Sequence, residues 1–213
     1  MKESTQKEKI LKKIRNALIH KSDDFVVGVD TGKSIYPYQD EIPEMIFAEN
    51  FTAVNGKFKY LENLEEFVAD VNMICKAVGE KKPFCADDSI IKLFSNQLQF
   101  DKDFSNSLKP KVSITNCECL SARTGSIFVS SALSSGRRGF VSADIHIVLA
   151  YTSQLKADIK ESIGFIKSKN DGTFPSFISM ITGPSKTADI EKTLILGAHG
   201  PKEIYLFLLD DSF

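Results

Sequence analysis

Three loop-like segments in the C-terminal half carry side chains that suit the binding of a small anion. Ser135-Gly-Arg137-Arg138 places two guanidinium groups side by side, and such planar groups can fork onto a carboxylate or a phosphate. Gly183-Pro-Ser185-Lys186-Thr187 adds two hydroxyls and an ammonium group, and Thr124-Gly125 forms a third polar turn. If these loops converge, they make a crevice for one small acid.

The segment from Gly183 to Glu191 also has the pattern of a corner between a strand and a helix. A β-rich run over 177–181 enters a Gly-Pro turn, and Thr187 is expected to cap a helix over 187–194. The acidic residues that follow would lie in its first turn, where negative charge favours the helix dipole. Free amides at such a helix start can bind an anion. A well-capped corner without a ligand explains the same residues, so both interpretations stay open.

Glu118 and His199 are the candidates for catalysis. Glu118 is the carboxylate nearest in sequence to the basic loops and could act as an acid, a base or a nucleophile, although an exposed salt bridge is the favoured interpretation. His199 lies between glycines, which permit close approach of the backbone. His146 lies within a predicted strand and could face a cleft, but a hydrogen-bonded, half-buried ring is commoner. His20 ends a predicted helix, where the helix dipole stabilises a positive charge.

Two further patterns resemble a phosphate-binding loop and a metal site, but each lacks residues that such a site needs. Gly28-Val-Asp-Thr-Gly32-Lys-Ser has three residues between its glycines where a P-loop needs four, and Tyr36-Pro37 interrupts the helix that must follow. Cys117 and Cys119 flank Glu118, but zinc and iron–sulfur sites usually need three or four protein ligands. We therefore expect no metal held by this chain alone.

Alternating elements must position these loops. Periodicity of about 3.6 residues predicts helices, which cover 4–20, 43–53, 63–78, 89–97, 155–167 and 187–194. Short β-branched or aromatic runs predict strands, which cover 57–61, 83–86, 112–115, 126–131, 145–150, 177–181 and 204–209. Strands that alternate with helices indicate βαβ units, and so an α/β fold with a largely parallel sheet.

Composition narrows the class of protein. The chain has 213 residues, 42% of them hydrophobic, with 27 Lys+Arg, 28 Asp+Glu and four Cys. This length suits one large domain, or one domain with an attached arm. We expect an N-terminal helix and linker over 1–40 and an α/β domain over 41–213. The net charge of −1 argues against a nucleic-acid coat, and no apolar run is long enough to span a bilayer. Few cysteines and no signal sequence predict a reduced, cytoplasmic protein.

Three segments taken together resemble the LUD domain family, the lactate-utilisation protein C group. They are residues 183–191 followed by Gly200-Pro201, Ala122-Arg-Thr-Gly-Ser126 before a strand, and Ser135-Gly-Arg-Arg138 followed by Ser142 and His146-Ile-Val. The resemblance covers residues 45–210. Two positions depart from the family pattern: Arg123 stands where an acidic residue is frequent, and Ala143-Asp144-Ile145 stands where a proline commonly precedes the strand.

The resemblance implies a Rossmann-like, mostly parallel sheet flanked by helices, of the sugar-phosphate isomerase and CoA-transferase type, with a small antiparallel lobe. It also implies a subunit for the oxidation of lactate that acts with iron–sulfur partner proteins, whose clusters this chain would not hold. Two alternatives stay open: a stand-alone enzyme for a small phosphorylated or CoA-linked acid, and a ligand-binding protein without catalysis. The resemblance indicates a process and assigns no reaction to this chain by itself.

Overall fold

The computed structural model describes residues 6–19, 42–103, 110–190 and 193–211. The chain divides into two units, residues 1–40 and residues 41–213. The first contains helix α1 (Gln6–Ile19), which corresponds to the helix predicted over 4–20. His20 and the glycines of the P-loop-like segment lie outside the described residues. The rest of this section concerns the second unit.

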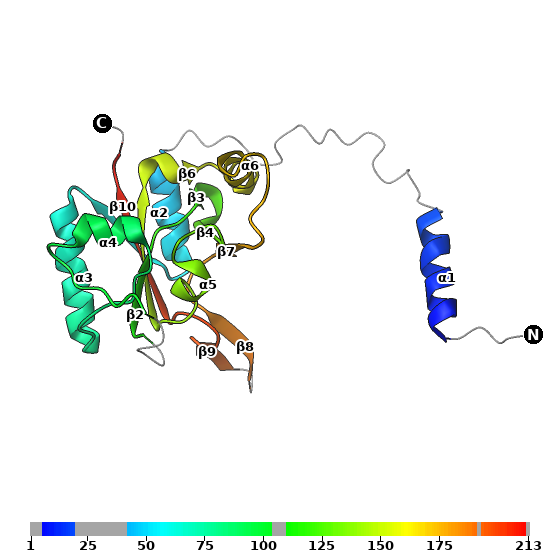
Figure 1. Ribbon diagram of the computed structural model, residues 1–213, viewed down its shortest axis with the longest axis horizontal. Helices are drawn as coiled ribbons and strands as arrows, with labels where there is room; N and C mark the ends of the chain where they lie inside the picture. Colours follow the sequence, from blue (N-terminus) through cyan, green and yellow to red (C-terminus); the bar gives the residue numbers. More distant parts are fainter. Residues whose placement is uncertain (1–5, 20–41, 104–109, 191–192, 212–213) are drawn as a thin grey trace, which may run out of the picture. The chain divides into compact units, whose positions relative to one another are not determined.

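A four-stranded sheet, here called the main sheet, forms the centre of the second unit (Figure 1). Its order is β1 (Lys57–Leu61), β10 (Glu203–Leu209), β5 (Ile145–Tyr151) and β2 (Val112–Thr115), and every neighbouring pair is parallel. β2 and nearly all of β5 are buried, as expected for strands whose two faces are both covered. The predicted largely parallel sheet is confirmed.

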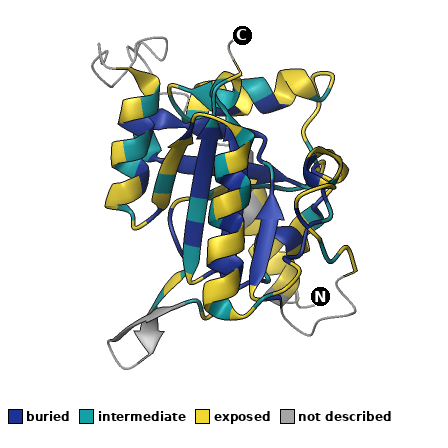
Figure 2. Ribbon diagram, turned by 90° about the vertical axis from the view of Figure 1, so that its left-hand side faces the viewer, coloured by how far each residue is buried: buried dark blue, intermediate teal, exposed yellow. Residues whose placement is uncertain are grey.

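Helices α3 (Leu64–Val78) and α4 (Asp88–Phe94) pack on one face of the main sheet. The Asn63 side chain caps α3 by accepting a hydrogen bond from the Glu66 amide, and Gly79, at φ +67°, ends the helix. Side chains alternate between the faces of a strand, so Ile145, Ile147 and Leu149 of β5 contact these helices. The outer surfaces of the helices are exposed while the strands between them are buried (Figure 2).

The opposite face of the main sheet packs against α2 (Pro43–Ala53) and a second sheet. In that sheet the order is β6 (Leu155–Lys156), β3 (Cys119–Ser121), β4 (Ser126–Ser130) and β7 (Ile178–Ile181). β4 is antiparallel to both of its neighbours, whereas β3 and β6 are parallel. This second sheet matches the antiparallel lobe that the family resemblance implies.

Short elements and α6 complete the unit. A 3-10 turn, η3 (Ala122–Thr124), joins β3 to β4, and α5 (Gly136–Gly139) lies between β4 and β5. Another 3-10 turn, η4 (Thr152–Gln154), follows β5. Helix α6 (Ile159–Lys169) packs on the outer face of the second sheet, and the Asp158 side chain caps it.

One predicted element has the wrong type. The segment expected to be a helix over 187–194 is instead a hairpin of β8 (Lys186–Ile190) and β9 (Thr193–Leu196). The segment is rich in β-branched residues, which favour extended backbone, and two short strands pair their backbone groups with each other. Thr187 therefore caps no helix, and no helix start supplies free amides there.

Three boundaries also differ from the predictions. The segment 155–167 begins as β6, and α6 starts only at Ile159, after its Asp158 cap. The predicted strand 83–86 is reduced to isolated bridges of Phe84 with Asp101 and Ser113. The helix predicted over 89–97 ends at Phe94.

Candidate functional site

Glu118 belongs to a buried polar group that we call the carboxylate cluster, formed by Glu118, Ser130 and Lys169. Glu118 lies in the turn between β2 and β3, and only 1% of the residue is exposed. Its Oε1 accepts a hydrogen bond from Ser130 Oγ at 2.6 Å, and its Oε2 forms an ion pair with Lys169 Nζ at 2.7 Å. The salt-bridge interpretation is the one observed, except that the carboxylate is buried rather than exposed.

The surroundings fix the hydrogen-bond directions in this cluster. Ser130 Oγ also accepts a hydrogen bond from the Ala132 amide at 2.9 Å, so its own proton is directed at the carboxylate. Lys169 ends α6, and half of its side chain is exposed. The cluster thus joins a buried carboxylate to a cation at the surface.

A second buried polar group, which we call the polar chamber, consists of Ser113, Thr115, Ser135 and His146. The strand register places Ser113 beside His146, and Thr115 Oγ1 lies 2.8 Å from His146 Nε2. Ser135 precedes α5, whose residue Gly139 lies against Thr115. All four residues are buried. The prediction of a half-buried His146 underestimated its burial.

The histidine in this chamber is neutral at physiological pH. His146 is fully buried, and desolvation of the charged form lowers its pKa from 6.5 to about 3. A neutral ring has one N–H and one lone pair, and which nitrogen carries the proton depends on the tautomer. His146 Nδ1 has no hydrogen-bond partner among the residues that the structure describes.

The arginines predicted to bind an anion lie on α5, next to the polar chamber. Arg137 and Arg138 are both exposed. The Arg137 guanidinium lies 5.0 Å from the centre of the Phe177 ring, a cation–π contact that orients the group without neutralising it. This arrangement suits a guanidinium that meets a ligand from solvent.

The structure brings two of the predicted loops together. The Ser185 amide donates to the Pro201 carbonyl at 2.9 Å, and a Cβ added to Gly200 would lie 3.1 Å from the Ser185 Cβ. Gly183, at φ +76°, packs against the Val54 carbonyl, which also accepts a hydrogen bond from Lys186 Nζ at 3.4 Å. His199 is exposed beside them.

These two loops lie at the edge of the main sheet where its strands begin. Directly after them, the Lys202 and Glu203 amides donate to the Asp144 carbonyl, one residue before β5. Glu118 is placed near the other edge, because the carbonyl of its neighbour Cys117 accepts a hydrogen bond from Gln154, just after β5. One crevice that holds both Glu118 and His199 is therefore absent among the described residues. The ligand-binding and catalytic roles of these side chains stay predictions.

Thr124 and Gly125 form a turn that packs against α2. Asn50 Nδ2 donates to the carbonyls of Ala122 and Arg123 at 3.0 and 3.1 Å. Gly125 has φ +54°, and a Cβ there would lie 2.3 Å from the Phe51 amide nitrogen. The glycine is thus required for the approach of α2, which explains this turn without a ligand.

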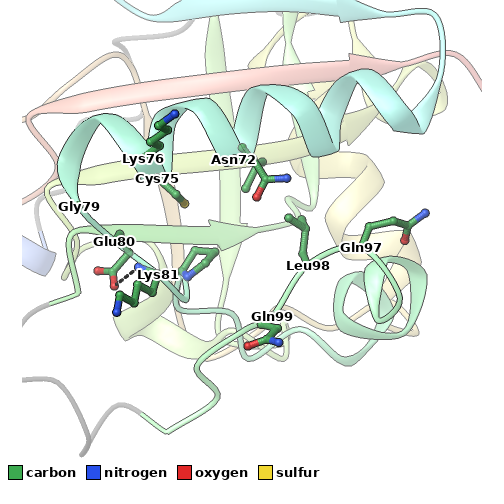
Figure 3. Close-up of a pocket in the computed structure, with 11 residues that line it drawn as sticks. Asn72, Cys75, Lys76, Gly79, Glu80, Lys81, Gln97, Leu98 and Gln99 are labelled. Carbon is green, nitrogen blue, oxygen red and sulfur yellow. Dashed lines mark hydrogen bonds between the residues drawn. The ribbon is translucent and has the colours of Figure 1, made fainter.

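A groove of about 590 Å³ lies on the α3 and α4 side of the main sheet, away from the predicted residues (Figure 3). Val71, Cys75 and Leu98 are among its apolar lining, and Asn72 and Gln97 contribute amides. In Figure 3, Asn72 and Cys75 extend from α3 on one side and Leu98 lies on the other. No sequence motif indicated this groove.

The four cysteines are core residues. All are buried and unpaired by disulfides. Desolvation raises the pKa of Cys75 and Cys119 to about 11 and that of Cys85 to about 12, and it raises the pKa of Cys117 well above 9. Thiols in this state are poor nucleophiles and poor metal ligands. Within the described residues, no three His, Cys, Asp or Glu side chains are grouped to hold a metal ion.

Sequence reasoning missed Ser130, Lys169, Ser113 and Thr115. Ser113 and Thr115 alternate with Val112 and Ile114, so their polarity on one buried face was a detectable signal. Lys169 offered no such signal, because 51 residues separate it from Glu118. Among the described residues, no helix is both long and apolar enough to cross a membrane.

Comparisons with known proteins agree with this fold. A lactate utilization protein C of Shouchella clausii is 32% identical over 181 residues, which are 78% of this chain and 79% of that protein. An uncharacterized protein of Neisseria meningitidis is 32% identical over 95 residues, or 45% of this chain and 40% of that protein. The lactate utilization protein C of Bacillus subtilis is 29% identical over 113 residues, which are 52% of this chain and 47% of that protein. For these last two, the match spans less than half of the relative.

A crystal structure of a DUF162 family protein from Deinococcus radiodurans superposes with a TM-score of 0.57 over 81% of this chain and 99% of that one. At 16% identity this likeness concerns the fold alone. The family model of the LUD domain matches residues 45–209, which lie within the second unit and include both polar groups. The chain belongs to the LUD domain family.

Proposed function

We propose that this chain is a lactate utilization protein C-like subunit, which acts in the oxidation of lactate to pyruvate together with iron–sulfur partner proteins. The observation that carries the proposal is the alignment with the Shouchella clausii protein, which covers nearly four fifths of both chains. An alignment of that extent spans most of both chains rather than one shared motif.

The electrons of this reaction need an acceptor. Oxidation of lactate to pyruvate releases two electrons and two protons, and iron–sulfur clusters on partner proteins would accept the electrons. The cysteines of this chain do not fit such a cluster, because they are distributed over separate hydrophobic groups and burial raises their pKa values. We therefore assign the clusters to partners.

The exposed arginines of α5 are the groups that we propose for binding the acid. A guanidinium can donate two parallel hydrogen bonds to a carboxylate, and Arg137 is held over Phe177 with its donors open to solvent. Glu118 and His199 stay the proposed proton-transfer groups. For Glu118 the proposal requires displacement of Lys169, whose Nζ forms an ion pair with one oxygen of the carboxylate.

Growth and copurification test this proposal together. In the source organism, deletion of the gene should abolish growth on lactate as the carbon source, and the parent gene should restore it. The tagged chain should copurify with iron–sulfur proteins of the same cells. An Arg137→Ala/Arg138→Ala variant should restore growth poorly, whereas Lys92→Ala, at an exposed lysine of α4, should restore it fully. Normal growth of the deletion strain on lactate contradicts the proposal.

The exposed guanidinium on Phe177 also suits a second function, the binding of a small phosphorylated or CoA-linked acid by the chain alone. Thermal-shift measurements with hydroxy acids, sugar phosphates and CoA esters separate the two, because a ligand that binds only the native state raises the Tm. A rise with phosphorylated or CoA-linked acids but not with lactate favours the second function.

A further inference from the structure

Three polar atoms of the polar chamber are buried without a partner. They are His146 Nδ1, Ser113 Oγ and Ser135 Oγ, and none has a hydrogen bond to any residue that the structure describes. Native proteins pair nearly all buried polar groups with protein atoms or with ordered water, since an unmade hydrogen bond is costly there. Three such atoms in one region therefore point to a ligand.

The strand register explains why these atoms gather. Ser113 and His146 are paired residues of neighbouring parallel strands, which are about 4.8 Å apart. Val112 and Ile145 face α3 and α4, so the next residue on each strand faces the opposite side. On that side Ser135 lies close to Thr115. A Cβ atom added to Gly139 would lie 2.8 Å from the Ser135 Cβ and 3.1 Å from the Thr115 Cγ2, so both side chains border the same position.

The chemistry of the chamber selects a small neutral ligand that both donates and accepts hydrogen bonds. Hydroxyl groups can do either, and a neutral His146 uses one nitrogen as donor and the other as acceptor. The four side chains of the chamber include no carboxylate to pair with a cation and no positive charge to pair with an anion, so a buried ion would be unfavourable.

We propose that the polar chamber binds one water molecule, which bridges His146 Nδ1 to the hydroxyls of Ser113 and Ser135. A buried water typically makes about three hydrogen bonds, which is the number offered here. Ser135 directly precedes α5 and has no side-chain cap bond to it. The water therefore ties α5, with Arg137 and Arg138, to strands β2 and β5 of the main sheet.

A crystal structure of the full chain at about 1.5 Å resolution tests the proposal directly. We expect a spherical density peak within roughly 2.7–3.2 Å of His146 Nδ1 and of at least one of the two serine hydroxyls. An empty chamber in which both hydroxyls bond to backbone carbonyls overturns the proposal. A peak that refines only as an ion overturns it as well.

A double-mutant cycle provides a second measurement in solution. Ser113→Ala and Ser135→Ala should each lower the Tm by about 2–4 °C, while Ser134→Ala, at an exposed neighbouring serine, should leave it unchanged. Because both hydroxyls contact the same water, the double variant should lose clearly less than the sum of the two single losses. Strict additivity contradicts a shared ligand.

Discussion

Acidification provides a quantitative test of the buried, neutral His146. In the folded protein desolvation lowers the pKa of this ring from 6.5 to about 3, whereas in the unfolded chain the ring titrates near 6.5. Between these two values the unfolded state binds a proton that the folded state does not. Stability is therefore fully present above pH 6.5 and is lost as the pH falls toward 3.

The size of the effect follows from the two pKa values. One pKa unit corresponds to about 1.36 kcal/mol. A pH of 5.0 lies about 1.5 units below the pKa of the ring in the unfolded chain. Lowering the pH from 7.5 to 5.0 should thus cost about 2 kcal/mol from this group alone. The carboxylates of Glu203 and Asp211, whose pKa values are lowered from 4.5 and 3.8, lose their contributions below this window.

Urea unfolding followed by circular dichroism at several pH values between 5 and 7.5 measures the effect. His146→Gln removes the titrating group, so the free energy of unfolding of this variant should change by about 2 kcal/mol less than that of the parent over the same range. If the parent and the variant have the same pH dependence, the ring is not held neutral, and the reasoning from its burial is refuted.

Three further predictions, each based on a different contact, can be tested by chemical denaturation. Lys169→Met should lower the free energy of unfolding by about 2 kcal/mol, because it leaves the Glu118 carboxylate buried without its cation. Adding Glu118→Gln should recover part of that loss. An unchanged free energy in the single variant argues against a structural ion pair. Gly125→Ala should lower the free energy of unfolding by about 4 kcal/mol or more, since its Cβ would collide with the α2 backbone. Gly164→Ala, which has open space around its Cβ, should instead stabilise α6 by about 1 kcal/mol. Asn63→Ala should cost about 1 kcal/mol through loss of the α3 cap, and an unchanged midpoint contradicts that role.

The strands of the main sheet could be predicted because local sequence and environment agree. β5 and β10 are covered on both faces, so they are nearly continuous apolar runs. The hairpin β8–β9 was predicted as a helix because acidic residues after Thr187 imitate a helix start. Its backbone pairs two short strands across a turn, and neither strand alone has a diagnostic periodicity.

The candidate site was harder to predict than the fold for a physical reason. Side chains such as Arg137 and Lys186 could be chosen by chemistry, but their partners depend on contacts made over long sequence distances. Lys186 contacts Val54, which is 132 residues away, and Glu118 contacts Lys169. Periodicity carries no information on such pairs.

The positions of the two polar groups constrain how the chain could act on an acid. The carboxylate cluster lies near the carboxyl ends of the main strands, where ligands of open α/β sheets usually bind, but its carboxylate is buried behind Lys169. The arginines are exposed on α5, whose Gly139 lies against Thr115 of the polar chamber. His146 is fully buried, so an acid held by Arg137 would bind at the surface and not against this ring. In the proposed function, chemistry at Glu118 would therefore need a partner or ligand that displaces Lys169 from the carboxylate.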